Sequence, residues 1–154
     1  MQLQNAAGVL ALIEALGLRD SLRLEHVNRA MGSLRLAGRM QVVENEQRWL
    51  FDVAHNPGAA AALAASLEQH EAPAAVAIVG ILDDKPFREI LETLLPVCRK
   101  AILTSPKIHR ALPAEALRDA ARGLTAEIAV IPDVSEAVGH AMKNAAGNEA
   151  ICIA

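Results

Sequence analysis

The chain has 154 residues, a formal net charge of −3 at pH 7, 53% hydrophobic and 21% charged residues. These values are typical of a globular protein with one domain-sized core, and they exclude a disordered or fibrous chain. No apolar run approaches a membrane span, the acidic balance disfavours nucleic acid as a partner, and the N-terminus lacks a signal peptide. Cys98 and Cys152 have no metal-binding or disulfide-framework spacing, so we expect a protein of the reducing cytoplasm.

The N-terminal part predicts helices and no sheet. Apolar residues recur at helical spacing over residues 5–16, and a second amphipathic helix is expected over residues 21–31. The basic, glycine-containing segment 33–39 is interpreted as a connector. We therefore expect a helical segment over residues 1–32 and a separate domain over residues 33–154.

From residue 40 onward, strands and helices alternate. Two extended segments at 40–43 and 49–53 predict a hairpin. Helices are expected over 57–69, 86–97, 113–122 and 134–145, and strands over 74–81, 101–104, 128–131 and 150–153. The middle strands are apolar throughout, as strands covered by helices on both faces are. The pattern predicts an α/β fold: a three-layer, Rossmann-like domain with a mostly parallel sheet of about six strands, hairpin included.

Polar loops follow three of these strands, at the edge where open α/β sheets bind ligands. Segment 52–58 reads Asp-Val-Ala-His-Asn-Pro-Gly and directly precedes a helix, whose N-terminus favours an anion. In the alternative interpretation, Asn56 merely caps that helix and Asp52 ends the strand. Segment 80–86 carries two aspartates and a lysine, although either aspartate could be a helix cap, and segment 104–110 could be a solvated loop.

Several common catalytic motifs are absent from the sequence. There is no G-x-x-x-x-G-K-[ST] phosphate loop, no G-x-G-x-x-G fingerprint and no G-x-S-x-G elbow. Cys98 lies at the end of a predicted helix without a partner histidine, so we interpret it as structural. The residues alone predict a ligand-binding α/β domain that does not grip nucleotide phosphates with a loop of its own.

Three motifs in order resemble the Mur ligase superfamily. They are Gln4-Asn5-Ala6-Ala7, Leu36-Ala37-Gly38-Arg39-Met40-Gln41-Val42 and Phe51-Asp52-Val53-Ala54-His55-Asn56-Pro57. Within the superfamily, the chain resembles the C-terminal part of the bifunctional bacterial dihydrofolate synthase/folylpolyglutamate synthases, and segments 80–85 and 104–112 continue the likeness. Peptidoglycan amino-acid ligases are the neighbouring alternative. Pro86 departs from the family pattern, which often has aspartate there.

The resemblance implies a fold and a reaction. It implies a Mur-ligase-type C-terminal domain, truncated at its C-terminus and preceded by a helical remnant of a P-loop ATPase domain. In the family's reaction, ATP phosphorylates a carboxylate of dihydropteroate or folate, and the amine of L-glutamate attacks the acyl phosphate. ATP and Mg²⁺ are the implied cofactors, with the metal ligands in the upstream domain and none here. The isolated chain is therefore expected to be inactive.

The resemblance also implies roles for residues on the nucleotide side. Asn5 matches an asparagine at the adenine end of ATP, and Arg39 matches an arginine that reaches the ATP phosphates across the domain interface. Asp52 matches an aspartate that holds the ribose or a nearby water. His55 and Asn56 match the loop lining the nucleotide and glutamate sites, and we expect Arg39 and His55 to take part in catalysis.

On the substrate side, the resemblance places Lys85 and Ser105 near the incoming glutamate. A second hypothesis comes from a different class of protein. A chain of this fold could be a stand-alone, non-catalytic module that binds a nucleotide or an amino acid.

Overall fold

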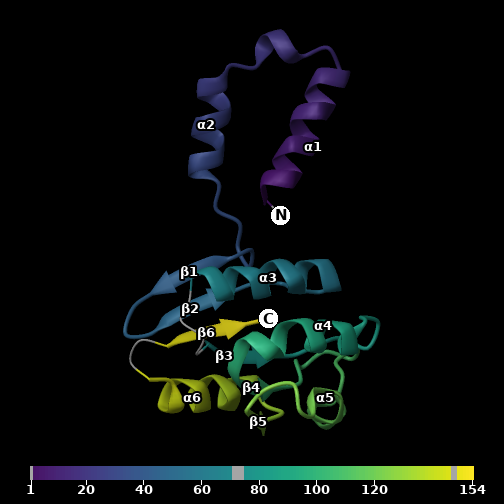
Figure 1. Ribbon diagram of the computed structural model, residues 1–154, viewed down its shortest axis with the longest axis vertical. Helices are drawn as coiled ribbons and strands as arrows, with labels where there is room; N and C mark the ends of the chain where they lie inside the picture. Colours follow the sequence, from purple (N-terminus) through teal and green to yellow (C-terminus); the bar gives the residue numbers. More distant parts are fainter. Residues whose placement is uncertain (1, 71–74, 147–148) are drawn as a thin grey trace. The chain divides into compact units, whose positions relative to one another are not determined.

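The computed structural model describes residues 2–70, 75–146 and 149–154. The chain divides into two compact units, Met1–Leu36 and Ala37–Ala154 (Figure 1). The sequence placed the division after Gly32; in the structure, the second helix runs on to Ser33 and residues 34–36 belong with the helices.

The first unit is a pair of helices, α1 (Gln2–Ala15) and α2 (Leu24–Ser33), joined through a short 3₁₀ turn, η1 (Arg19–Ser21). Both predicted helices are present, and α2 begins later than expected because η1 takes up the preceding residues. None of residues 5–20 and 22–36 is buried. Leu16 and Leu24 are 63% and 75% exposed. The described part of this unit therefore leaves apolar helix surface uncovered.

The second unit is built on one six-stranded sheet. Its strands are β1 (Gln41–Glu44), β2 (Arg48–Phe51), β3 (Ala75–Val79), β4 (Cys98–Leu103), β5 (Glu127–Val130) and β6 (Ala150–Ile153). The spatial order is β1-β2-β6-β3-β4-β5. The pair β1–β2 is antiparallel, and the other pairs are parallel. The expected mostly parallel sheet of six strands, hairpin included, is confirmed.

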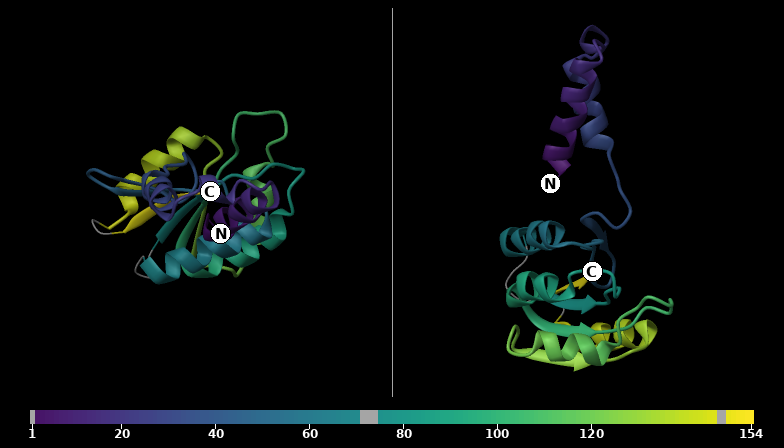
Figure 2. Two further views of the ribbon diagram at one scale, coloured as in Figure 1. Left: turned by 90° about the horizontal axis from the view of Figure 1, so that it is seen from above. Right: turned by 90° about the vertical axis from the view of Figure 1, so that its right-hand side faces the viewer.

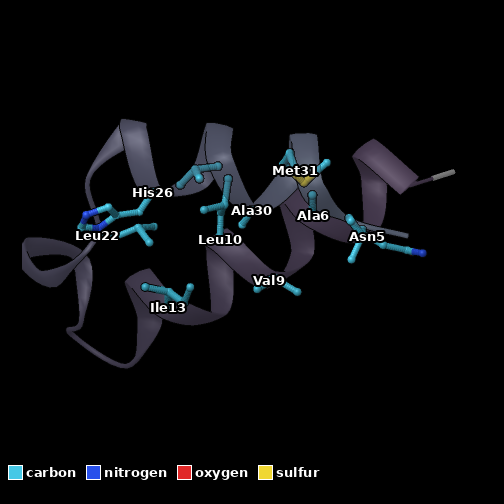
Figure 3. A pocket seen from close by; sticks show the side chains of 11 residues that line it. Asn5, Ala6, Val9, Leu10, Ile13, Leu22, His26, Ala30 and Met31 are labelled. Carbon is cyan, nitrogen blue, oxygen red and sulfur yellow. The ribbon is translucent and has the colours of Figure 1, made fainter. Parts of the chain in front are cut away.

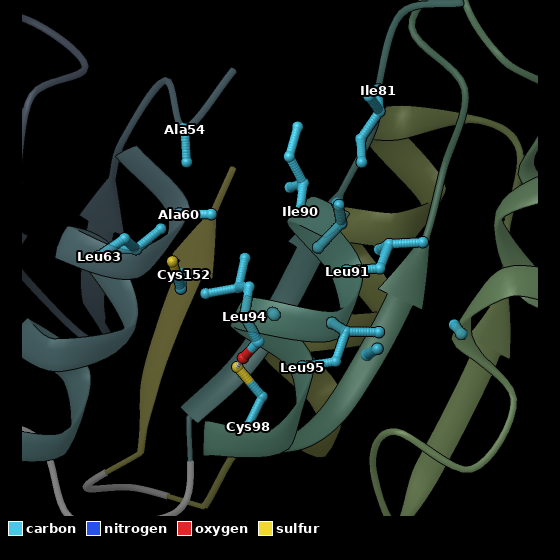
Figure 4. Close-up of a cluster of buried hydrophobic side chains, with 14 of the residues drawn as sticks. Ala54, Ala60, Leu63, Ile81, Ile90, Leu91, Leu94, Leu95, Cys98 and Cys152 are labelled. Carbon is cyan, nitrogen blue, oxygen red and sulfur yellow. Dashed lines mark hydrogen bonds between the residues drawn. The ribbon is translucent and has the colours of Figure 1, made fainter. Parts of the chain in front are cut away.

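Helices cover both faces of this sheet (Figure 2). They are α3 (Pro57–His70), α4 (Phe87–Leu94) with the 3₁₀ turn η2 (Leu95–Val97), α5 (Ala114–Ala121) and α6 (Val134–Asn144). Successive β3 residues point to opposite faces: Ala77 packs in the cluster formed with α3, α4 and α5, whereas Ile78 packs against α6. Figure 4 shows the first cluster, in which leucines of α3 and α4 lie around the β6 residue Cys152. The three-layer architecture is confirmed.

Three details differ from the sequence-based expectation. Cys98 opens β4 instead of ending a helix, and burial raises its pKa to about 12, in keeping with a structural thiol. In β5, Glu127 is exposed and the other three residues are only partly buried, because β5 is an edge strand. Strand β3 ends at Val79 instead of Ile81, and Ala74, its expected first residue, lies outside the described residues.

The predicted role of the prolines is confirmed. Helix α3 begins at Pro57, and Pro86 and Pro113 stand directly before α4 and α5. A proline at these positions costs no helical hydrogen bond, since its missing N–H has no partner in the first turn. Among the helices of the described ranges, none has the length and hydropathy needed to cross a membrane.

Candidate active site

The carboxyl ends of β2, β3 and β6 meet around a cavity of about 140 Å³. Its walls are mostly apolar, and His55 and Lys85 are the ionisable side chains that line it. His55 comes from the loop after β2, and Lys85 comes from the loop after β3. The structure therefore brings together two polar loops that the sequence could only place at strand ends.

The carbonyl oxygen of Val53 is the point where Arg39 and His55 meet. It accepts hydrogen bonds from the backbone N–H of His55 at 2.9 Å, from His55 Nδ1 at 3.0 Å and from Arg39 Nη1 at 3.3 Å. Because a carbonyl can only accept, Nδ1 of His55 carries a proton, and in the neutral ring Nε2 then holds the lone pair. One backbone atom thus fixes the orientation of both predicted catalytic side chains.

A tight turn over residues 37–40, called here the Arg39 turn, carries Arg39 to this carbonyl. Gly38 has φ +64°, a left-handed conformation suited to glycine, and its carbonyl accepts the Val53 N–H at 2.8 Å. A Cβ at position 38 would lie 3.0 Å from Cγ2 of Val53. Glycine is therefore required here both by its backbone angle and by close packing.

Asp52 lies beneath the Arg39 turn and is only 7% exposed. Its Oδ2 accepts the backbone N–H of Met40 at 2.8 Å, and its Oδ1 is buried with no hydrogen-bond partner among the described residues. Burial raises the pKa of Asp52, against the opposing effects of the Met40 N–H and the charges of Arg39 and His55. Oδ1 is thus buried in the domain, and Oδ2 is bonded to the Arg39 turn.

Asn56 has a structural function as well as a place in the loop. Its Oδ1 accepts the N–H of Ala59 at 2.8 Å, which caps the first turn of α3. Its Nδ2 lies 3.4 Å from Nε2 of His55. The helix-cap interpretation is confirmed, and the same side chain also contacts the His55 ring.

Lys85 is bonded to the carboxylate of Asp84, for which the sequence had suggested a helix-capping role. Asp84 Oδ2 accepts from Lys85 Nζ at 2.9 Å and from Arg110 Nη1 at 3.1 Å. The hydrogen bond from Lys85 is the main cause that lowers the pKa of Asp84. The expectation that Asp83 or Asp84 caps the next helix is wrong, because Pro86 occupies the cap position and no side chain caps α4.

The loop after β4 is anchored to the loop after β3 and is not freely solvated. Leu82 and Ala111 form an antiparallel bridge, and the Leu112 N–H donates to the Ile81 carbonyl at 2.9 Å. Ser105 Oγ donates to the Leu112 carbonyl at 2.9 Å, and Ser105 is not among the residues that line the cavity. Ser105 therefore braces the loop that carries Arg110.

Asn5 belongs to the first unit. It lines an apolar groove between α1 and α2, together with side chains that include Val9, Leu10 and Met31 (Figure 3). Its expected role at the adenine end of ATP stays a prediction.

The cationic side chains at and beside the cavity suit an anion. Lys85 lines the cavity, and Arg39 is hydrogen-bonded to Val53 of its lining. An ammonium and a guanidinium both donate charge-assisted hydrogen bonds to phosphate or carboxylate oxygens. In the parts of the chain that the structure describes, no group of three or more His, Cys, Asp or Glu side chains is placed to hold a metal ion.

Some site features had no signal in the sequence. Met40 adopts φ +49°, in the left-handed region that methionine rarely occupies, so its residue type did not predict this conformation. The pairing of Asp84 with Arg110 joins residues 26 positions apart. The only hint of that pairing was the adjacency of both loops to strand ends in a parallel sheet.

The fold and site define a class: an α/β domain that gathers anion-binding side chains at the carboxyl edge of a parallel sheet. The family model described as "Mur ligase, glutamate ligase domain" matches residues 38–154. The chain belongs to the Mur ligase family, which confirms the resemblance seen in the sequence.

Known relatives point to one branch of that family. The chain is 32% identical over 124 residues to a Mycobacterium tuberculosis dihydrofolate synthase/folylpolyglutamate synthase, covering 78% of this chain and 26% of the relative. It is 37% identical over 94 residues to the Escherichia coli enzyme of the same name, covering 60% and 22%. A solved structure of Escherichia coli FolC in complex with DHPP and ADP matches with a TM-score of 0.85 and 28% identity, covering 97% of this chain and 35% of that chain. The chain thus spans about a quarter to a third of the relatives it matches.

Proposed function

We propose that this chain is the glutamate-ligase domain of an ATP-dependent ligase that joins L-glutamate to dihydropteroate or folate through an acyl phosphate. The observation that carries the proposal is that His55 and Lys85 line one cavity at the carboxyl edge of the sheet, and that Arg39 is hydrogen-bonded to Val53 of the same lining. Family membership and relatives named dihydrofolate synthase/folylpolyglutamate synthase support it. One similar structure was solved with Mn, AMPPNP and L-glutamate bound, at 27% identity and a TM-score of 0.76.

Arg39 is assigned to the phosphates of ATP. Among the hydrogen bonds of the described residues, its guanidinium makes one, to the Val53 carbonyl. Its other N–H donors are therefore available to a phosphoryl group, and its charge does not depend on pH in the working range. A guanidinium held in this way stabilises negative charge that develops as the phosphoryl group is transferred.

Lys85 and His55 are assigned to L-glutamate. Lys85 is placed to bind a carboxylate of glutamate at the cavity. The amine must lose a proton as it forms the new C–N bond and phosphate leaves the acyl carbon. In the neutral ring, His55 Nδ1 donates to Val53 and Nε2 holds the lone pair, so we assign to Nε2 the role of accepting that proton. Ser105 acts on this side by bracing the loop of Arg110.

Asn5, Asp52 and Asn56 are assigned to the nucleotide side, with Asn5 at the adenine end and Asn56 holding His55. We further propose that the first unit is the last part of an ATPase domain. Its apolar, unburied helix surfaces support this, because such surfaces in a stable protein are usually covered. That domain would supply the phosphate loop and the Mg²⁺ ligands. The whole ligase would work in the cytoplasm, and the isolated chain would have no turnover of its own.

The proposal is tested by Lys85→Met in the ligase that contains this chain. We expect the KM for L-glutamate to rise by about 10-fold or more, as for loss of one charge-assisted hydrogen bond, with the KM for ATP nearly unchanged. Lys143→Met, on α6 and away from the cavity, is the matched control. An unchanged KM for L-glutamate in Lys85→Met would contradict the assignment, and amide formation by the purified 154-residue chain would contradict its dependence on another domain.

A further inference from the structure

One carboxylate beside the cavity joins two cations that come from different loops. Oδ2 of Asp84 accepts a hydrogen bond from Lys85 Nζ at 2.9 Å and another from Arg110 Nη1 at 3.1 Å. Lys85 lines the cavity at the carboxyl edge of the sheet, whereas Arg110 is not among the lining residues. The link from Arg110 to the cavity therefore runs through Asp84.

The backbone brings Arg110 to this place independently of its side chain. The loop after β4 and the loop after β3 are joined as short antiparallel strands are. The Asp83 N–H donates to the Arg110 carbonyl at 2.8 Å, and the Leu112 N–H donates to the Ile81 carbonyl at 2.9 Å. Because backbone atoms make these hydrogen bonds, they remain when the Arg110 side chain is replaced. A variant at position 110 therefore tests the guanidinium itself.

The charges of the three side chains decide what Lys85 can offer to an anion. Lys85 and Asp84 by themselves form a neutral pair, which attracts a dicarboxylate weakly. Arg110 adds a second cation at the same carboxylate oxygen, so the group as a whole is positively charged. The hydrogen bond from Lys85, and to a smaller extent the charge of Arg110, lowers the pKa of Asp84, which keeps the carboxylate ionised at neutral pH.

The same contacts restrict the Lys85 side chain before a ligand binds. The side chains of Lys85, Asp84 and Arg110 are 29%, 40% and 49% exposed, so none of them is fixed by burial. A free lysine side chain has many rotamers, and ordering it on binding costs free energy. Arg110 holds the Asp84 carboxylate from the neighbouring loop, and Asp84 in turn limits the positions open to Lys85 Nζ.

We propose that Arg110 is a positioning residue for L-glutamate: it holds the Asp84 carboxylate and thereby keeps the Lys85 ammonium at the cavity, without itself contacting the substrate. This inference rests on the proposed function, in which Lys85 binds a carboxylate of glutamate. It assigns to Arg110 an effect on the KM for L-glutamate that passes through Asp84 and Lys85.

A double-mutant cycle in the ligase that contains this chain separates positioning from direct contact. Arg110→Met alone should raise the KM for L-glutamate by about 3- to 5-fold, the upper range for a partly exposed ion pair, with kcat and the KM for ATP within about 1.5-fold of the native values. In the Lys85→Met background, the same change should alter the KM for L-glutamate by less than about 1.5-fold, because the group that Arg110 positions is gone.

Two results of this cycle would overturn the inference. One is an unchanged KM for L-glutamate in Arg110→Met. The other is an equal rise in both backgrounds, which would show that Arg110 binds glutamate on its own. If Lys85→Met itself leaves the KM for L-glutamate unchanged, the proposed function fails instead, so the two failures are distinguishable.

A second cycle tests the route through the carboxylate. In the Asp84→Ala background, Arg110→Met should change the KM for L-glutamate by less than about 1.5-fold, because Arg110 has lost the group through which it acts. A further rise of about 3-fold or more would show that Arg110 acts by another route, and it would overturn the inference.

The matched control is Arg118→Met. Arg118 lies in α5, its side chain is 52% exposed, it is paired with Asp119 at 3.8 Å, and it is not among the residues that line the cavity. Its replacement should leave the KM for L-glutamate within about 1.5-fold of the native value. A rise equal to that of Arg110→Met would show a general effect of lost positive charge and contradict the inference.

Hydrogen exchange separates positioning of Lys85 from a general role in loop structure. In the 154-residue chain, the amides of Asp83 and Leu112 should stay protected in Arg110→Met, since their acceptors are backbone carbonyls. Loss of that protection would show that the Arg110 side chain holds the two loops together, and it would overturn the inference.

Discussion

Arg99 and Glu149 tie the beginning of β4 to the residue directly before β6. Nε and Nη2 of Arg99 donate to Oε1 and Oε2 of Glu149 at 2.5 and 2.9 Å, and the Ala146 N–H donates to the same carboxylate at 2.8 Å. The Glu149 side chain is 6% exposed and that of Arg99 is 35% exposed. The pair lies at the edge of the sheet opposite the cavity, so it acts on stability and not on the site.

Arg99→Met should lower the free energy of unfolding of the chain by about 2–3 kcal/mol. The loss is large because the variant leaves the buried Glu149 carboxylate without its cation. It is smaller than the loss of about 3–5 kcal/mol expected for breaking a fully buried ion pair, because Arg99 is partly exposed to solvent. Arg122→Met is the matched control, since its pair with Asp119 is exposed and should contribute less than about 0.5 kcal/mol. Urea unfolding of both variants measures the difference. Equal stabilities would show that the Arg99–Glu149 pair contributes nothing.

The same pair predicts a pH dependence. The hydrogen bonds from Arg99, followed by the Ala146 N–H and nearby charge, lower the pKa of Glu149 below its usual value of 4.5. The pair therefore stabilises the fold fully above about pH 4.5 and loses this contribution as pH falls through the lower, folded-state pKa. The difference in unfolding free energy between the native chain and Glu149→Gln should shrink in that acidic range. A difference that stayed constant from pH 7 down to pH 3 would contradict this assignment.

Gly80→Ala tests the packing of the two loops around the cavity. A Cβ at position 80 would lie 2.9 Å from Cδ of Pro106 and 3.3 Å from Cγ2 of Thr104. These atoms belong to a rigid ring and a buried side chain, so we expect a loss of about 1–3 kcal/mol in urea unfolding.

The matched control for that variant is Gly139→Ala. Gly139 lies in α6 with no atom within 4 Å of an added Cβ, and alanine there should raise stability by about 0.5–1 kcal/mol. The prediction is wrong if both alanine variants change stability in the same direction.

The sequence predicted the elements better than their arrangement. Apolar runs such as Val76–Val79 identified the buried strands, because a strand covered on both faces needs apolar side chains at every position. The insertion of β6 between β2 and β3 depends on contacts between residues far apart in the chain. No local pattern in Ala150–Ile153 encodes them.

The site was predictable to the extent that it lies at strand ends. His55 and Lys85 were found because they follow strands, and the structure places both at one cavity. The left-handed conformation of Met40 was not predictable, since methionine does not favour it and the hydrogen bond from the Met40 N–H goes to Asp52, 12 positions away in the sequence. Tertiary contacts, not local preference, set the geometry around Arg39.

The most direct test of the central claim is the turnover of Arg39→Ala in the ligase that contains this chain. If Arg39 stabilises the transferring phosphoryl group, kcat should fall by about 10²-fold or more. Arg35→Ala is the control, since Arg35 is exposed and its hydrogen bonds within the described ranges go to the nearby carbonyls of Gly32 and Leu34. A kcat within about 2-fold of the native value for Arg39→Ala, matching Arg35→Ala, would remove Arg39 from the active site and contradict the account.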